Sequence, residues 1–195
     1  VDGDRAYAAA FGSLEVLDVS DPTAPTPVAT LALGAHEALQ LALADGRAYV
    51  LFAASGAQGG SVVVIDVSTA APRVLARIDE ADCTAIAAHA GHLYCGNAGR
   101  LATFDVSDAR RMTRVDDLNL EALFPGRLRV SGGLLYAFGG HQVTEAVPIP
   151  IAWPAALAVL DLTTPSHPIP IGRLDLGTFQ GGDLVVGPTA AYAIG

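Results

Sequence analysis

Short runs of apolar residues, separated by Gly, Asp, Ser and Pro, recur along the whole chain. In one representative stretch the runs occupy residues 39–43, 48–53, 61–67 and 74–78. The third run is β-branched and apolar at consecutive positions, as expected for a strand that is buried on both faces. No segment keeps the apolar period of about 3.6 residues that indicates an amphipathic helix. The pattern predicts an all-β protein with four short strands per unit.

Each unit is marked by a tyrosine inside an apolar run and by an aspartate that follows it. The tyrosines are spaced 42, 45, 42 and 56 residues apart and are Tyr7, Tyr49, Tyr94, Tyr136 and Tyr192. The aspartates lie in a recurring phrase, LEVLDVSDPTAP in its first copy, and are Asp18, Asp66, Asp105 and Asp161. A repeat of about 40–45 residues with several short strands is typical of the blades of a β-propeller.

The repeat divides a single β-propeller domain or segment (1–195) into units of similar length. Their approximate limits are 1–37, 38–82, 83–124, 125–180 and a partial unit at 181–195. About four four-stranded blades are therefore expected. The additional strand around Tyr192 favours a segment of a longer propeller, of about six to eight blades, over a closed ring of four.

Two roles are open to the recurring aspartates. In the phrase Asp-Val-Ser-Asp-Pro, the Asp and Ser side chains can bond backbone N–H groups two residues on, and Pro22 fixes its own φ, so that the phrase forms a turn. The alternative is a calcium loop, but Val, Ser and Leu follow where such a loop needs further oxygen ligands. We therefore expect turns.

The phrase Leu-x-Val/Ile-x-Asp-Val-Ser-Asp-Pro, followed by a Pro-led strand and a hairpin with a tyrosine, resembles the LVIVD-repeat family of β-propellers. The fullest copy is LEVLDVSDPTAPTPVATL at residues 14–31, and four copies in register extend over essentially the whole chain. The third copy departs from the pattern, with Asp-Ala-Arg-Arg at residues 108–111, and the fourth has Asp-Leu-Thr-Thr-Pro at 161–165. The resemblance implies a bacterial or archaeal secreted or cell-surface propeller, a class in which most members have no assigned activity.

Composition narrows the choice of partners. Apolar residues make up 51% of the chain and charged residues 16%, so a packed core is expected rather than disorder. The formal net charge of −9 argues against nucleic acid as a partner. The longest uncharged run, residues 146–160, contains three prolines and is too short for a membrane-spanning helix.

The two cysteines, Cys83 and Cys95, are 12 residues apart. If Ala90 and Gly91 form a hairpin turn, Cys95 lies opposite Ile86, and Cys83 lies three positions further along the ladder. Extending the ladder in this register puts the two residues on opposite faces and about 10 Å apart along the strands, which is beyond the reach of a disulfide. We therefore expect two free thiols.

A polar cluster is predicted at the start of the innermost strands, where loops of neighbouring blades share one face and ligands usually bind. The residues at equivalent distances before the tyrosines, with one adjacent histidine, are His36, Glu37, Asp82, Arg127, Gln180 and Asp183. One interpretation is a hydrated channel lining with mutually satisfied hydrogen bonds. Another is a small-ligand site, or a calcium site held by Glu37, Asp82 and Asp183, against which Arg127 argues. No other cofactor is expected.

The fourth unit is 14 residues longer than the first and third, and the excess lies between its tyrosine and its aspartate. This insertion, residues 139–156, falls between the second and third strands and therefore on the same face as the polar cluster. It carries His141, Glu145 and Trp153. A stiff, apolar loop that carries a tryptophan over a channel mouth suits a recognition role. The alternative is a cover that packs Trp153 against its own blade.

The sequence favours a non-catalytic, extracellular or cell-envelope propeller module that binds a protein or glycan through the face carrying the insertion. The alternative is part of a propeller hydrolase or lactonase-like enzyme with a cation in its channel, and a purely structural spacer is a third interpretation. No catalytic residue is assigned, because the chain has no GxSxG, P-loop or GxGxxG motif.

Overall fold

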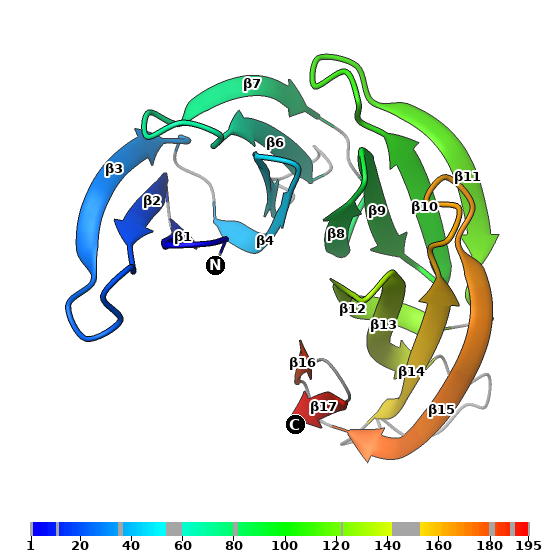
Figure 1. Cartoon of the computed structure of the whole chain (residues 1–195). Coiled ribbons are helices and arrows are strands. Elements are labelled where there is room, and N and C mark those ends of the chain that lie inside the picture. Colours follow the sequence, from blue (N-terminus) through cyan, green and yellow to red (C-terminus); the bar gives the residue numbers. More distant parts are fainter. Residues whose placement is uncertain are drawn as a thin grey trace. The chain divides into compact units, whose positions relative to one another are not determined.

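The computed structural model describes residues 2–10, 12–34, 37–53, 60–79, 82–121, 123–141, 153–179, 182–187 and 190–194. These residues form strands and turns but no helix, and the strands are arranged in antiparallel sheets (Figure 1). The chain divides into two compact units. Unit 1 comprises Val1–Asp82 and Asp108–Arg111, and unit 2 comprises Cys83–Ser107 and Met112–Gly195. The prediction of an all-β protein is confirmed.

Unit 1 contains one three-stranded and one four-stranded sheet, each with its strands in chain order. The first sheet consists of β1 (Arg5–Ala10), β2 (Ser13–Asp18) and β3 (Thr26–Ala32). The second consists of β4 (Ala38–Ala44), β5 (Arg47–Phe52), β6 (Ser61–Asp66) and β7 (Arg73–Ile78). The bounds of β4–β7 agree to within one residue with the four strands that the apolar runs predict.

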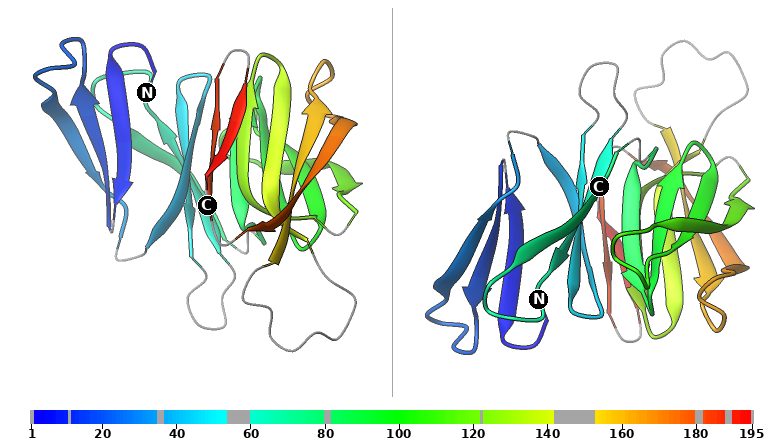
Figure 2. Two further views of the ribbon diagram at one scale, coloured as in Figure 1. Left: turned by 90° about the horizontal axis from the view of Figure 1, so that it is seen from below. Right: turned by 90° about the horizontal axis from the view of Figure 1, so that it is seen from above.

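Unit 2 contains two four-stranded sheets and one two-stranded sheet, again in chain order. The first four-stranded sheet consists of β8 (Ala85–His89), β9 (His92–Asn97), β10 (Arg100–Asp105) and β11 (Thr113–Asn119). The second consists of β12 (Leu123–Ser131), β13 (Leu134–His141), β14 (Trp153–Asp161) and β15 (Ile169–Phe179). The two-stranded sheet consists of β16 (Asp183–Val186) and β17 (Ala191–Ile194). Each four-stranded sheet is twisted, so that its last strand crosses its first at an angle (Figure 2).

The middle strands of the four-stranded sheets are buried on both faces. On β6 the consecutive residues Val63 and Val64 are both 0% exposed, although consecutive side chains of a strand point to opposite faces. The repeat tyrosines Tyr49 and Tyr94 are also buried, and burial raises the pKa of both phenols. The Tyr94 hydroxyl donates a hydrogen bond to the carbonyl of Pro165 at 2.9 Å. Burial on both faces is what a stacked blade requires.

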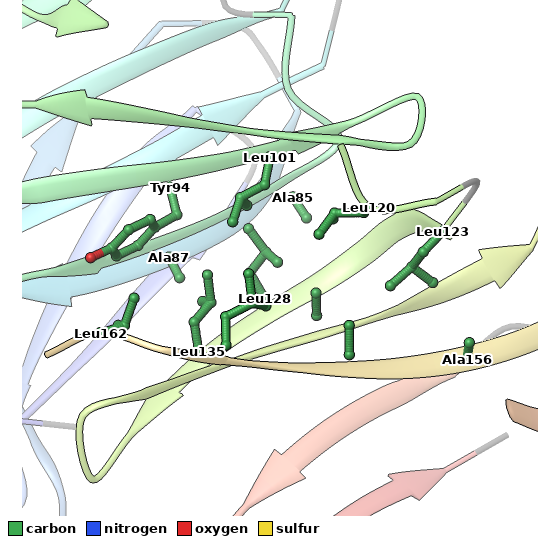
Figure 3. Packing of buried hydrophobic residues seen from close by; sticks show 13 residues of the cluster. Ala85, Ala87, Tyr94, Leu101, Leu120, Leu123, Leu128, Leu135, Ala156 and Leu162 are labelled. Atoms are coloured by element: carbon green, nitrogen blue, oxygen red, sulfur yellow. The ribbon is translucent and has the colours of Figure 1, made fainter. Parts of the chain in front are cut away.

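An apolar core fills the space between the two four-stranded sheets of unit 2 (Figure 3). Tyr94 and Leu101 of the first sheet belong to the same buried cluster as Leu128 and Leu135 of the second. Full burial of one such leucine stabilises the fold by about 2 kcal/mol. The two sheets therefore pack face to face, and this packing fixes the position of β12.

The recurring aspartates form the turns that the sequence predicts. In each turn, Oδ1 of the aspartate accepts the amide of the residue two positions on. The distances are 2.9 Å for Asp18 and Ser20, 3.0 Å for Asp66 and Ser68, 2.8 Å for Asp105 and Ser107, and 2.7 Å for Asp161 and Thr163. Hydrogen bonds from the Ser or Thr hydroxyl of that same residue, followed by these amide bonds, hold the pKa of all four carboxyl groups below the usual range. The turn interpretation is confirmed.

The turn at Asp66 makes the stability of unit 1 sensitive to acid. Hydrogen bonds from the Ser68 hydroxyl and amide, followed by a bond from Arg73, lower the pKa of Asp66 to about 2. In the unfolded chain an aspartate has a pKa of about 3.9. Ionised Asp66 therefore stabilises the fold above about pH 4, and this contribution is lost as the pH falls toward 2.

We expect Asp66→Asn to lower the urea midpoint at pH 6, because the neutral amide accepts weaker hydrogen bonds from Ser68 and loses the ion pair with Arg73. The difference from wild type should shrink steadily between pH 4 and pH 2, where the aspartate itself becomes neutral. Urea unfolding across this range measures it. A difference that is the same at pH 2 and pH 6 would contradict the assigned role of the carboxylate.

The expectation of two free thiols is wrong, because Cys83 and Cys95 form a disulfide with their Cα atoms 5.3 Å apart. The predicted register of the hairpin is right. However, β8 begins only at Ala85, and Thr84 donates its amide to the carbonyl of Gly96 at 2.8 Å. The chain departs from the regular ladder before Ala85, so extrapolating the ladder to Cys83 gives too large a separation. The disulfide joins the segment that enters β8 to the middle of β9.

Candidate functional site

The site described below does not include four of the six residues in the predicted polar cluster. His36 and Gln180 lie outside the described residues. Glu37 and Asp82 both belong to unit 1, and both side chains are exposed. The role of these four residues stays a prediction.

The other two predicted residues, Arg127 and Asp183, meet between the first strands of two sheets of unit 2. Arg127 Nε lies 3.2 Å from Asp183 Oδ1, and Arg129 Nη2 lies 3.3 Å from the same oxygen. The amide of Leu184 also donates to this oxygen at 2.9 Å. The hydrogen bond from the Leu184 amide, followed by the positive charges of the two arginines, lowers the pKa of Asp183. The carboxylate is therefore ionised at neutral pH and balances one of the two guanidinium charges.

Arg129 is the residue of this cluster that sequence reasoning missed. Counting back from the tyrosine finds Arg127 alone, whereas residues two apart on a strand lie on the same face. That alternation was the available signal. Each arginine is also bonded to its own strand: Arg127 Nη1 donates to the carbonyl of Gly126 at 2.8 Å, and Arg129 Nη1 donates to that of Leu128 at 3.0 Å.

A β-bulge places an aromatic side chain on the same face as the two arginines. On β12, Pro125 pairs with Gly139 and Arg127 pairs with Phe138, so that Gly126 is an extra residue in the ladder. The extra residue shifts the alternation by one position. Phe124, Arg127 and Arg129 consequently lie on one face and are exposed or partly exposed, whereas Pro125 and Leu128 on the opposite face are buried. Phe124 is 37% exposed.

The insertion is shorter in the structure than in the sequence-based prediction. Gly139 pairs with Ala156 and Gly140 pairs with Ala155, so the two ends of the predicted loop continue β13 and β14 as strands. His141 ends β13 and Trp153 begins β14. Residues 142–152, with Glu145, lie outside the described residues, as do the side chains of His141 and Trp153.

The arginine cluster (Arg127, Arg129 and Asp183) lies toward the end of the β12–β15 sheet from which the insertion leaves. Arg127 is opposite Phe138, and Leu123, at the start of the same strand, is opposite His141, the last residue of β13. Three ladder positions therefore separate Phe138 from the end of β13, or about 10 Å along the strand. The end of β13 at His141 and the two arginines of β12 therefore lie near each other within one sheet.

Within the described ranges, no three His, Cys, Asp or Glu side chains gather closely enough to hold a metal ion. No helix in that part of the chain is long and apolar enough to cross a membrane. The chemistry that the described residues of this site offer is therefore that of guanidinium groups and an aromatic ring, together with one ion-paired carboxylate.

Successive four-stranded antiparallel sheets, each with its strands in chain order and packed face to face, are typical of the blades of a β-propeller. The family model of the LVIVD repeat matches residues 1–31. The chain thus carries an LVIVD repeat at its start, which confirms the resemblance that the recurring phrase indicated.

Solved structures resemble the chain in fold, among them two with TM-scores above 0.6. One is a hypothetical selenium-binding protein from Sulfolobus tokodaii, with a TM-score of 0.61 and 13% identity over 87% of this chain and 48% of that one. The other is a functionally unknown protein from Desulfotomaculum acetoxidans, with a TM-score of 0.65 and 11% identity over 97% of this chain and 58% of that one. The chain thus spans about half the length of each. No curated protein matches it in sequence.

Proposed function

We propose that the chain is a non-catalytic, extracellular or cell-surface β-propeller module that binds a protein or glycan through the face carrying the insertion. The observation that carries this proposal is that two features of unit 2 lie near each other. A partly exposed cluster of Arg127, Arg129 and Asp183 lies toward the end of the sheet from which the longest connection between second and third strands leaves. Binding residues are commonly presented in this way, by loops and strand ends on a rigid scaffold.

The disulfide supports a location of the protein outside the cytosol. Both cysteines of the chain are consumed by the bond between Cys83 and Cys95. Disulfides persist in oxidising compartments and are rare in the cytosol of most organisms. The LVIVD repeat points the same way, because it is common in secreted and surface proteins.

The ion pairs favour binding over hydrolysis. In the hydrolase or lactonase-like alternative, Glu37, Asp82 and Asp183 would hold a divalent cation. Asp183 Oδ1 already accepts bonds from an amide and two guanidinium groups. A metal ion at this carboxylate would have to displace the arginines or lie beside two positive charges.

A loop replacement tests the proposal. In β9 and β10 the chain uses a two-residue Ala-Gly turn between Asn97 and Arg100, with φ values of 44° and 79°. The paired residues at the equivalent position of β13 and β14 are Gly139 and Ala156. Replacing residues 140–155 with Ala-Gly removes the insertion together with the strand ends at 140–141 and 153–155, and it keeps the hairpin type. The control is the same turn in place of residues 53–60, between the paired residues Phe52 and Ser61 of unit 1.

Both variants and the wild type are screened by biolayer interferometry against panels of oligosaccharides and secreted-protein fragments. We expect saturable binding of at least one partner, lost in the 140–155 variant and kept in the 53–60 control. Ester and lactone hydrolysis is assayed in parallel, with and without calcium. Binding that survives the 140–155 replacement, or calcium-dependent turnover that Asp183→Asn abolishes, would overturn the proposal.

A further inference from the structure

We infer that Phe124, Arg127 and Arg129 form a binding strip for a carboxylate-bearing saccharide, such as an oligomer of uronic acids. The arginines bind the carboxylates, Phe124 covers the apolar face of a sugar ring, and Asp183 positions the guanidinium groups. This inference rests on the proposed binding function and names the class of ligand.

The strip carries net positive charge on an acidic protein. Two guanidinium groups share one carboxylate, which leaves one positive charge locally, whereas the whole chain has a formal net charge of −9. Repulsion from distant carboxylates is screened over about 8 Å at physiological ionic strength, so the nearby arginines dominate the field at the strip. A short anionic ligand is therefore attracted to the strip.

The arginines have donors left for a ligand. A guanidinium group has about five N–H donors. Within the described part of the chain, Arg127 uses two of them, on Asp183 and on the carbonyl of Gly126, and Arg129 likewise uses two, on Asp183 and on the carbonyl of Leu128. The two side chains are 39% and 38% exposed. The remaining donors suit the paired oxygens of a carboxylate, which arginine binds in a bidentate manner.

The guanidinium groups are held in place before a ligand arrives. The amide of Leu184 fixes Oδ1 of Asp183, and this oxygen in turn accepts from both arginines. A side chain that is already ordered loses less conformational entropy on binding. Asp183 is thus a positioning residue, and its charge keeps the two like-charged arginines close together.

The shape of the strip favours an extended saccharide. Arg127 and Arg129 are two positions apart, about 7 Å along the strand, and Phe124 lies about the same distance further on because one residue is bulged out. An exposed aromatic ring offers a flat apolar surface, against which the C–H face of a sugar can pack. A line of one ring and two cations matches a polymer that repeats a ring and a carboxylate. An acidic peptide offers the carboxylates without the ring.

Titration calorimetry with trimers of galacturonate and of mannuronate tests the inference. The comparison ligands are the methyl-esterified trimer, which keeps the shape but loses the charge, and a tri-glutamate peptide. We expect at least one acidic trimer to bind. Arg127→Gln with Arg129→Gln should weaken that binding at least about tenfold, because two charged hydrogen-bonding groups are lost. Phe124→Ala should weaken it about threefold or more, and binding of the methyl ester should be weaker than that of the acid by at least about tenfold.

The chain offers a matched control for the double variant. Arg100 and Arg114 both pair with Asp117, at another position in unit 2. Arg100→Gln with Arg114→Gln removes the same charge and the same kind of ion pair, and it should change affinity by less than about twofold. Thermal unfolding of both double variants shows whether the fold is kept.

Three results would overturn the inference: no binding of either acidic trimer, equal weakening by the two double variants, or binding of the tri-glutamate peptide in preference to the trimers. Its failure differs from that of the proposed function. A partner that is lost with residues 140–155, but bound equally well without Arg127 and Arg129, would leave the binding module in place and remove only the acidic saccharide.

Discussion

Replacing both cysteines with alanine is expected to lower the free energy of unfolding by about 3 kcal/mol. Cys83 and Cys95 are separated by 12 residues, and a crosslink over such a loop restricts mainly the unfolded chain. For a protein of this size the loss corresponds to a fall in Tm of roughly 6–12 °C. Thermal unfolding of C83A/C95A beside the wild type, followed by circular dichroism, measures this effect.

The reductant dithiothreitol supplies the matched comparison. It should lower the Tm of the wild type toward that of C83A/C95A and leave the variant unchanged, since the variant has no thiol. Alkylation of the denatured, unreduced wild type should label no cysteine. If two cysteines are labelled, the disulfide is absent in solution and the main support for an oxidising compartment is lost. If reduction leaves the wild-type Tm unchanged, the bond does not stabilise the fold as expected.

Gly139→Ala is expected to destabilise unit 2 by about 3 kcal/mol, because a methyl group has no room at this position. A Cβ atom there would overlap the carbonyl oxygen of Phe124 and lie 2.8 Å from the amide nitrogen of Gly126. Both are backbone atoms of β12, so no side-chain rotation relieves the overlap. The two strands would have to separate at the bulge. Urea unfolding gives the change in free energy.

Gly172→Ala is the control for this substitution. Gly172 lies on β15, and a Cβ atom there would have nothing within 4 Å. Alanine in an open position of this kind is neutral or slightly stabilising, because it restricts the unfolded chain. Equal urea midpoints for the two variants would show that β12 and β13 do not approach each other as the bulge requires.

Features that depend on neighbouring residues could be predicted from the sequence. The strands follow from short β-branched runs between turn residues. The turns can be predicted because they use residues that adopt positive φ. Asp45 and Gly46, for example, have φ values of 54° and 69°, as a two-residue hairpin turn requires. The turn at Asp66 likewise closes within two residues. Local hydrogen bonds of this kind do not depend on how the sheets pack.

Features that depend on where a ladder ends or slips could not be predicted in this way. Cys83 reaches Cys95 because the chain departs from the ladder two residues after it, at the start of β8. Phe124 shares a face with Arg127 only because Gly126 is bulged out. A strict alternation places both pairs wrongly. The sequence therefore indicated Arg127 and Asp183 of the site but not Phe124, whereas Arg129 could have been found from the regular alternation along β12.

A crystal structure of the chain grown with the tighter-binding uronate trimer is the most direct test of the central claim, that this propeller module binds acidic saccharides at one strip. The predicted result is a carboxylate within hydrogen-bonding distance of the Arg127 and Arg129 guanidinium groups, with a sugar ring against Phe124. A trimer bound elsewhere, or a strip that stays empty at saturating ligand, would contradict the claim.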